Sequence, residues 1–395
     1  MRKALFSMIV ILLSAGLMHC SKSSGGDGTN TTTTYEVTVS GVQAGWPIIH
    51  EASGQWEIVG EAMVSSSGTE TVVFSTIGLK VFNANGDVLA DRAYSSGKFN
   101  DMIMIARKSA AGIYSQLTTS ELAPGDLGFC HVAALAGSSS LPTRAEVTVS
   151  FTNGKSETAK ISLYQYDPGQ QTLWPARLTS GDWVAVNTAE AYHHWTDINI
   201  ENDVVGNSER FALDIMRIDA SYKLSNPDNS TDKTKYYSWN EDVLSAGSGT
   251  VVNVRKDQVD QEIGSYDLNE STGNFVVIQH GPALFSLYAH MMKSSATVSI
   301  GDAVVAGQVI GKIGNSGYST APHIHFQYMD DGDMVKGKGL PALFWGIKVN
   351  RLSDATLRSV VTRFPDIREQ NYLLTAGTYT VSGSTTLEYD IVTAP

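Results

Sequence analysis

The sequence contains little cysteine, no excess of positive charge and few long hydrophobic runs. Only two of the 395 residues are cysteine, and 28 Lys and Arg stand against 40 Asp and Glu, which gives a formal net charge of −12. Two cysteines are too few for a scaffold held by several disulfides. The deficit of Lys and Arg disfavours nucleic acid and anionic membrane surfaces as partners, because both are bound mainly through positive side chains. At 42% hydrophobic residues the chain can still bury domain cores, and its nine histidines become the most informative chemistry.

The N-terminus has the pattern of an export signal. Arg2 and Lys3 precede an apolar run at residues 4–18, which is too short to span a bilayer convincingly. We therefore predict that residues 1–19 form a secretory signal peptide and that the protein is exported.

The end of this signal resembles the bacterial lipobox. Leu17 and Met18 come shortly before Cys20, although His19 stands where a small residue is usual. The resemblance implies lipidation of Cys20, a membrane anchor and, in a bacterium with two membranes, an outer-membrane lipoprotein facing the periplasm or the surface. Secretion without a lipid is the alternative. Residues 20–34 contain no apolar side chain after Cys20 and predict a flexible tether.

Residues 35–168 alternate between apolar and polar side chains, as in Val147-Thr-Val149-Ser-Phe151. A period of two predicts strands with one buried face. Asn85-Gly86 and Asn153-Gly154 lie between such stretches and favour type I′ hairpin turns. About seven short strands at this spacing predict an immunoglobulin-like β-sandwich.

Cys130 and His131 are neighbours within this region. Adjacent residues on a strand point to opposite faces, so a paired thiol and imidazole nucleophile is not expected. Cys130 is predicted to be a small buried side chain, and His131 is predicted to have no functional role.

A second β-rich region is predicted at residues 174–348. Apolar runs such as Phe275-Val-Val-Ile278 and Leu287-Tyr-Ala-His290 are bounded by turn residues, and helical periodicity is scarce. The region is therefore expected to be mostly antiparallel β, followed by a C-terminal extension at residues 349–395. The predicted fold class of the whole protein is all-β.

Two histidines stand two residues apart in Pro322-His323-Ile-His325-Phe326. On a strand they share a face at a separation of roughly 6 to 7 Å. That arrangement suits one metal ligand beside one catalytic imidazole, whereas two surface histidines are the alternative.

Residues 301–326, with Gly307, Gly311, Gly314 and Gly317 before the histidine pair, are similar to the C-terminal motif of LytM and lysostaphin-type zinc endopeptidases. Tyr288-Ala-His290 occurs upstream in the order that family expects. The resemblance implies a LytM-type antiparallel β domain with a duplicated hybrid motif, Zn²⁺ as cofactor, and hydrolysis of peptide bonds in peptidoglycan cross-links.

The resemblance also implies roles for individual residues. His325 and Asp214, in Phe211-Ala-Leu-Asp214, fall on zinc ligands of the family. His290 and His323 would orient and deprotonate the attacking water and stabilise the oxyanion. The remaining histidine of this region, His280, is expected to be structural.

One position departs from the family pattern. Arg210 stands four residues before Asp214, where the first zinc-binding histidine belongs, and a guanidinium cannot ligate zinc. A replacement ligand is predicted from Tyr192-His193-His194-Trp195, with His193 favoured and His194 as the alternative. Otherwise Arg210 and Asp214 would form an ion pair in a metal-free groove, as in degenerate LytM domains that bind the cell wall or activate amidases.

Overall fold

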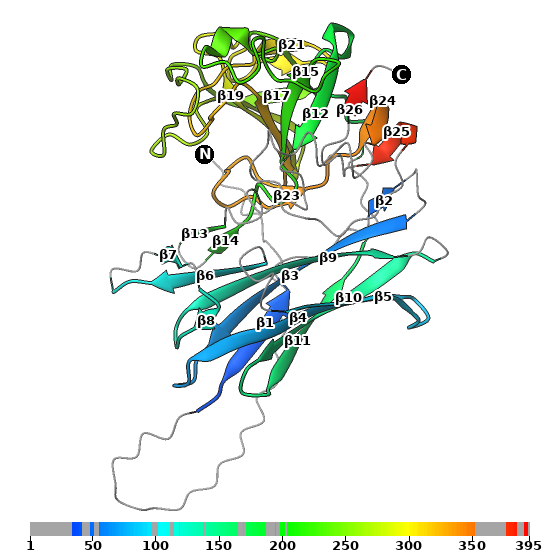
Figure 1. Ribbon diagram of the computed structural model, residues 1–395, viewed down its shortest axis with the longest axis vertical. Coiled ribbons are helices and arrows are strands. Elements are labelled where there is room, and N and C mark those ends of the chain that lie inside the picture. Colours follow the sequence, from blue (N-terminus) through cyan, green and yellow to red (C-terminus); the bar gives the residue numbers. More distant parts are fainter. Residues whose placement is uncertain are drawn as a thin grey trace, which may run out of the picture.

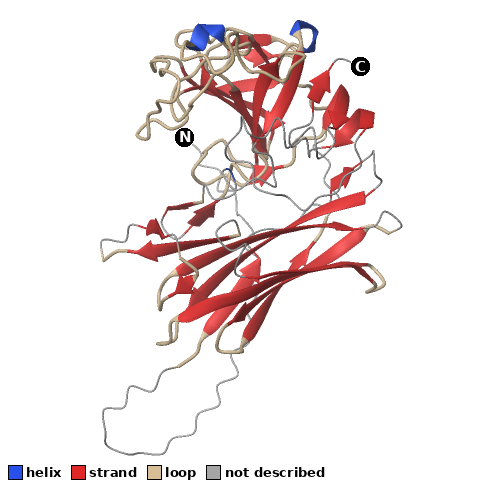
Figure 2. Ribbon diagram, in the orientation of Figure 1, coloured by secondary structure: helices blue, strands red, loops and turns tan. Residues whose placement is uncertain are grey.

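The computed structural model describes residues 34–41, 48–50, 55–95, 102–110, 114–117, 119–136, 140–164, 169, 171–186, 194, 198–201, 204–351, 377–384 and 391–393. Regular structure in these residues is almost entirely antiparallel β, so the predicted all-β class is confirmed (Figures 1 and 2). The helices described are short 3-10 turns such as Leu178–Ser180, and none of them is long and apolar enough to cross a membrane. Cys20 lies outside the described residues.

The N-terminal region forms a sandwich of two antiparallel sheets. The first sheet contains β1 (Val37–Gly41), β2 (Ile48–His50), β3 (Gln55–Ser66), β6 (Ile103–Lys108), β7 (Tyr114–Leu117) and β9 (Leu127–Ala136). The second contains β4 (Val72–Asn83), β5 (Val88–Ser95), β8 (Glu121–Leu122), β10 (Pro142–Phe151) and β11 (Ser156–Ser162). Apolar side chains from both sheets, including Ile58, Leu79 and Val147, bury one shared core. Its immunoglobulin-like character stays a prediction.

The two Asn-Gly pairs do form hairpin turns, between β4 and β5 and between β10 and β11. The predicted type I′ geometry is wrong, however. Gly86 and Gly154 have φ of 90° and 82°, whereas neither Asn85 nor Asn153 has a positive φ. A single left-handed glycine after the turn, as in a longer hairpin loop with a bulge, explains this difference because it needs only one residue without a Cβ.

Where β3 and β9 pair at the centre of the first sheet, side chains are buried on both faces. Cys130 points into the sandwich core with a relative exposure of 1%, as predicted, and burial raises the pKa of its thiol. The outward-facing Glu61 and His131 are directly paired across β3 and β9 and are equally inaccessible, at 3% and 5% exposure. The C-terminal domain therefore covers this outer face (Figure 1).

The C-terminal domain is built on one long antiparallel sheet of order β20-β17-β18-β19-β22-β15-β12-β26-β24-β25, with β23 paired to β22. These strands are β12 (Asp182–Val186), β15 (Leu213–Ile218), β17 (Gly249–Arg255), β18 (Asn274–Gly281), β19 (Leu284–Met291), β20 (Ala303–Val304), β22 (Ile324–Met329), β23 (Gly339–Leu340), β24 (Phe344–Arg351), β25 (Gly377–Ser384) and β26 (Ile391–Thr393). A separate pair is formed by β16 (Asp242–Leu244) and β21 (Val309–Lys312). Trp183, Tyr288 and Phe326 are fully buried in the core of this domain.

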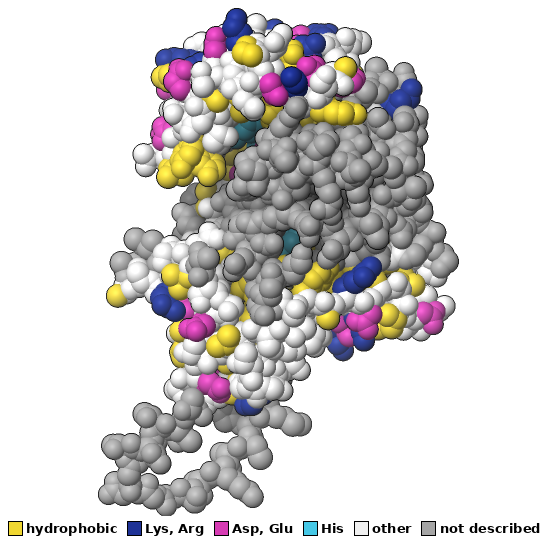
Figure 3. All heavy atoms as spheres, in the orientation of Figure 1, with side chains coloured by type: hydrophobic (Ala, Val, Ile, Leu, Met, Phe, Trp, Pro, Cys, Tyr) yellow, Lys and Arg dark blue, Asp and Glu magenta, His cyan; other side chains and the backbone are white. Residues whose placement is uncertain are grey.

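A small hairpin of the C-terminal domain packs against the sandwich. It consists of β13 (Asn199–Glu201) and β14 (Val204–Gly206), and its Ile200 and Val205 pack against Met104 and Phe129 on the outer face of the sandwich sheet. On the face shown in Figure 3, positive and negative side chains of the described residues are mixed over both parts of the molecule.

Candidate metal centre

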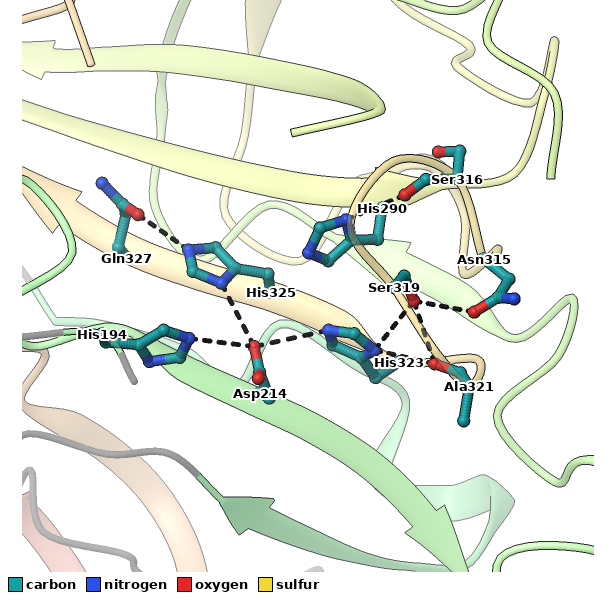
Figure 4. A network of polar contacts seen from close by, with 10 residues as sticks. All are labelled: His194, Asp214, His290, Asn315, Ser316, Ser319, Ala321, His323, His325 and Gln327. Atoms are coloured by element: carbon teal, nitrogen blue, oxygen red, sulfur yellow. Dashed lines mark hydrogen bonds and ion pairs between the residues drawn. The ribbon is translucent and has the colours of Figure 1, made fainter. Parts of the chain in front are cut away.

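Three neighbouring strands bring the predicted site residues together. In the sheet register, Asp214 on β15 lies opposite His325 on β22, which in turn lies opposite Ala289 on β19. His290 follows Ala289 directly, and His323 comes just before β22 (Figure 4). Antiparallel pairing of three strands that are far apart in sequence therefore gathers these four polar side chains at one edge of the core.

The carboxylate of Asp214 is the centre of this cluster. One of its oxygens, Oδ1, lies 3.1 Å from Nδ1 of His325, 3.4 Å from Nε2 of His323 and 3.5 Å from Nε2 of His194. Burial alone would raise the pKa of Asp214, but His194 and His323 hold this pKa well below its usual range. The side chain is therefore a carboxylate surrounded by imidazoles.

This donor set fits a tetrahedral metal ion. Zinc bonds to nitrogen and oxygen of about 2.0 to 2.2 Å place neighbouring ligand atoms about 3.3 Å apart. The separations of His325 and His194 from Asp214 Oδ1 are 3.1 and 3.5 Å, close to that spacing. Ligand atoms of His194, Glu209 and His325 also lie within 4.8 Å of one another.

A second residue orients His325. Its Nε2 donates to Oε1 of Gln327 over 2.8 Å, which leaves Nδ1 facing Asp214. An outer hydrogen bond that fixes the ring and its tautomer is the usual support of a metal-binding histidine. Burial alone would lower the pKa of His325, but the charge of Glu209 and the bond to Asp214 raise it overall.

The other two histidines are held in a different way. Nδ1 of His290 donates to the carbonyl of Ser316 over 2.9 Å, and Nδ1 of His323 donates to the carbonyl of Ala321 over 2.8 Å. Both rings are thus fixed through Nδ1, and Nε2 of His323 faces Oδ1 of Asp214. Burial, together with the neighbouring His323 and His325, lowers the pKa of His290 well below its usual value, so this imidazole is neutral.

His290 also has an unusual backbone conformation. Its φ is 59°, in the left-handed region that a residue with a Cβ rarely adopts. Strain of this kind persists where the surrounding structure holds a side chain in a required position. Here it directs the ring towards His323 and His325, with ring centroids 4.7 and 5.7 Å away.

The structure bears on only one of the two candidates for the replacement ligand. His193, the favoured candidate, lies outside the described residues, whereas the alternative, His194, is buried beside Asp214. His280 hydrogen-bonds to the carbonyl of Ser248 and to Ser286, each over 2.8 Å, as expected of a structural histidine.

Arg210 has another partner than the Asp214 of the alternative interpretation. The Arg210 side chain pairs with Glu61 of the sandwich, with Nε 2.9 Å from Oε2. Residues 208–211 form a turn, so the alternation of a strand does not place Arg210 and Asp214 on one face. His131, for which no functional role is expected, has its Nδ1 3.1 Å from Oε1 of the same Glu61.

Two residues of the site escaped the sequence analysis. Gln327 stands two residues after His325 and shares its strand face, a spacing that could have marked it. Glu209 is adjacent to Arg210, and the turn that brings it near His325 leaves no periodic signal.

Comparison with known proteins agrees with this site. Residues 235–336 match Peptidase family M23. The chain is 57% identical over 42 residues to the glycyl-glycine endopeptidase ALE-1 of Staphylococcus capitis, covering 11% of each protein. It is 36% identical over 93 residues to the peptidoglycan DD-endopeptidase ShyA of Vibrio cholerae, covering 24% of this chain and 18% of ShyA. It is also 35% identical over 97 residues to the murein hydrolase activator EnvC of Escherichia coli, covering 25% of this chain and 22% of EnvC.

These matches span less than a quarter of each relative. The family match, at residues 235–336, includes His290, His323 and His325. Residues 235–336 of the C-terminal domain are therefore similar to Peptidase family M23.

Proposed function

We propose that the protein is a zinc-dependent metalloendopeptidase that hydrolyses peptide bonds in peptidoglycan cross-links. The observation that carries this proposal is the single carboxylate oxygen of Asp214 surrounded by His194, His323 and His325 at 3.1 to 3.5 Å. The substrate class rests on relatives that are named peptidoglycan or glycyl-glycine endopeptidases.

Asp214, His325 and His194 are the proposed zinc ligands. Zinc, when bound, polarises the scissile carbonyl and lowers the pKa of the attacking water. Gln327 holds the ring of His325 so that Nδ1 faces Asp214, and Glu209 adds negative charge beside it. Two imidazole nitrogens and one carboxylate oxygen satisfy the preference of Zn²⁺ for nitrogen and oxygen ligands.

His290 and His323 are the proposed proton-transfer residues. Each donates Nδ1–H to a backbone carbonyl, so Nε2 is the atom that accepts a proton from the water or donates one to the leaving amine. Because burial keeps His290 neutral, its Nε2 can accept a proton without first losing one, and the protonated ring can then donate to the oxyanion.

We further propose that the protein is exported and anchored by a lipid on Cys20, which would keep the peptidase near the cell wall. The support is the signal-like segment at residues 1–19 and the resemblance of its end to a lipobox. The tether at residues 20–34 would let the folded domains reach wall peptides at some distance from the membrane.

A binding or activating role without catalysis is the second candidate. It is favoured by Arg210, which stands at a ligand position of the family and is engaged with Glu61, and by the similarity to an activator of murein hydrolases. The two candidates differ in one measurable respect, because only the enzyme requires a metal ion.

Metal analysis combined with digestion of purified peptidoglycan tests the proposal. The exported form is expected to contain about one zinc per chain, to release cross-linked peptides, and to lose this activity on chelation and regain it with added Zn²⁺. A purified, folded protein that contains no zinc and leaves peptidoglycan intact would contradict the enzyme and support the activator. Stimulation of a cell-wall amidase by that metal-free protein is the matching positive result.

The identity of the third ligand is tested separately by three matched variants. His194→Ala is expected to weaken zinc binding at least about 100-fold, because loss of an outer-sphere partner alone commonly costs 10- to 100-fold. Glu209→Gln is expected to weaken it by about tenfold through loss of negative charge, and His193→Ala serves as the neighbouring control. Competition with a chromophoric chelator measures the three affinities. A larger loss in His193→Ala than in His194→Ala would reassign the ligand.

A further inference from the structure

The interface between the sandwich and the C-terminal domain contains a buried charged cluster. Oε2 of Glu61 on β3 forms an ion pair with Arg210, 2.9 Å from Nε. Oε1 of the same carboxylate lies 3.1 Å from His131 Nδ1 and accepts from Asn207 Nδ2 over 3.4 Å. Arg210 also donates to the carbonyl of Val59 over 3.3 Å. The exposures of Glu61 and Arg210 are 3% and 1%. Removing a charged pair from water is costly, so this contact needs a role beyond filling space.

The charged cluster contacts one short turn of the C-terminal domain. Residues 207–211, here called the coupling turn, connect β14 to β15 and contain Asn207, Arg210 and the candidate ligand Glu209. Asp214 follows at the start of β15, three residues after the turn. The β13–β14 hairpin immediately before the turn is itself packed on the sandwich through Ile200 and Val205.

The other side of the coupling turn contacts the proposed metal site. The carbonyl of Ser208 accepts a hydrogen bond from Nε2 of Gln327 over 3.0 Å. The amide oxygen of the same Gln327 accepts from His325 over 2.8 Å. A continuous series of polar contacts therefore runs from Glu61 through the coupling turn and Gln327 to His325.

We propose that Glu61 is a positioning residue for the metal site, acting through Arg210 on the coupling turn, so that the N-terminal sandwich is required to form a competent site. The inference rests on the proposed zinc function of that site. The sandwich would thus do more than separate the peptidase from its anchor.

The ion pair between Glu61 and Arg210 indicates that the sandwich positions the coupling turn and does not merely adhere to it. Apolar contacts such as those of Ile200 and Val205 give adhesion with little directional preference. A buried carboxylate that pairs with Arg210 and accepts from Asn207 and His131 admits few arrangements and thereby fixes the coupling turn relative to β3. Burial alone would raise the pKa of Glu61, but Arg210 and the His131 hydrogen bond lower it overall, which keeps the ion pair intact.

The test compares Glu61→Gln with the wild-type full-length chain and with Glu121→Gln, a control at an exposed position of the same sandwich. We expect zinc affinity, measured by chelator competition, to fall at least tenfold in Glu61→Gln and to recover in part in Glu61→Asp. Amide hydrogen exchange in residues 207–215 should accelerate in Glu61→Gln alone. Unchanged affinity and unchanged exchange in Glu61→Gln would overturn the inference.

A second variant covers the case in which Glu61→Gln does not fold. Buried ion pairs can often be replaced by apolar residues of similar volume without loss of stability, so Glu61→Leu combined with Arg210→Met should remain folded. Wild-type zinc affinity in this stable double variant would show that the pair is only structural. If the wild-type chain binds no zinc, the proposed function fails, and hydrogen exchange in the coupling turn then decides the positioning role by itself.

Discussion

Replacing His325 with alanine is expected to remove zinc from the protein and to lower peptidoglycan cleavage by at least about 10³-fold. The Nδ1 atom of His325 lies 3.1 Å from Oδ1 of Asp214, and its ring is held by Gln327, so the variant loses a ligand that is already oriented. A Lewis-acidic metal contributes several kcal/mol to the transition state, and about 1.4 kcal/mol corresponds to each tenfold in rate. Zinc content per chain and the rate of release of cross-linked peptides are the two measurements.

His280→Gln is the matched control for this prediction. His280 belongs to the same sheet and is bonded to Ser248 and Ser286, away from Asp214. The control should keep about one zinc per chain even if its stability falls. A His325→Ala protein that retains stoichiometric zinc would show that the ion is bound elsewhere.

Replacing His323 with alanine is expected to lower kcat by about 10² to 10⁴-fold while zinc remains bound, the range that general acid–base groups commonly contribute. His323 lies 3.4 Å from Asp214 Oδ1 through Nε2, but its Nδ1 is fixed by the carbonyl of Ala321. Its proposed task is to handle the proton of the attacking water or the leaving amine. Single-turnover cleavage together with zinc content separates this role from metal binding.

His290→Ala provides the companion measurement. The two rings lie with their centroids 4.7 Å apart, and loss of either should affect the chemical step more than zinc affinity. The double variant should lose less than the product of the two single effects if the residues act as a unit. Loss of zinc in His323→Ala would instead make His323 a ligand and return His194 to a structural role.

Local patterns were sufficient to predict much of the fold. Alternation of apolar and polar side chains has a period of two, which depends only on the strand backbone, so Val147, Val149 and Phe151 could be assigned to the core from the sequence. The same rule placed Cys130 in the core and His131 on the opposite face. It also placed His323 and His325 on one side of the chain, where both now meet Asp214.

Side-chain alternation could not predict what covers the outer face of the first sandwich sheet. Periodicity shows that His131 and Glu61 leave the sandwich core, but it does not show what covers them. Arg210 is separated from Glu61 by about 150 residues, and only the packing of the two domains brings them to 2.9 Å. An unpaired buried charge is costly, so the pair must be satisfied somewhere, yet the partner is decided by tertiary structure.

By itself, the sequence determined the strands, the hairpin positions and the histidines and aspartate that carry the proposed chemistry, because these depend on short-range geometry and on a recognisable motif. Only the tertiary structure decided that His194 and Glu209 approach His325, that Gln327 orients it, and that Arg210 turns towards the sandwich. These contacts arise from the pairing of strands distant in the chain and from domain docking. The physical reason is that turns such as residues 207–211 have no side-chain period, so the direction of each side chain is set by the neighbours it meets.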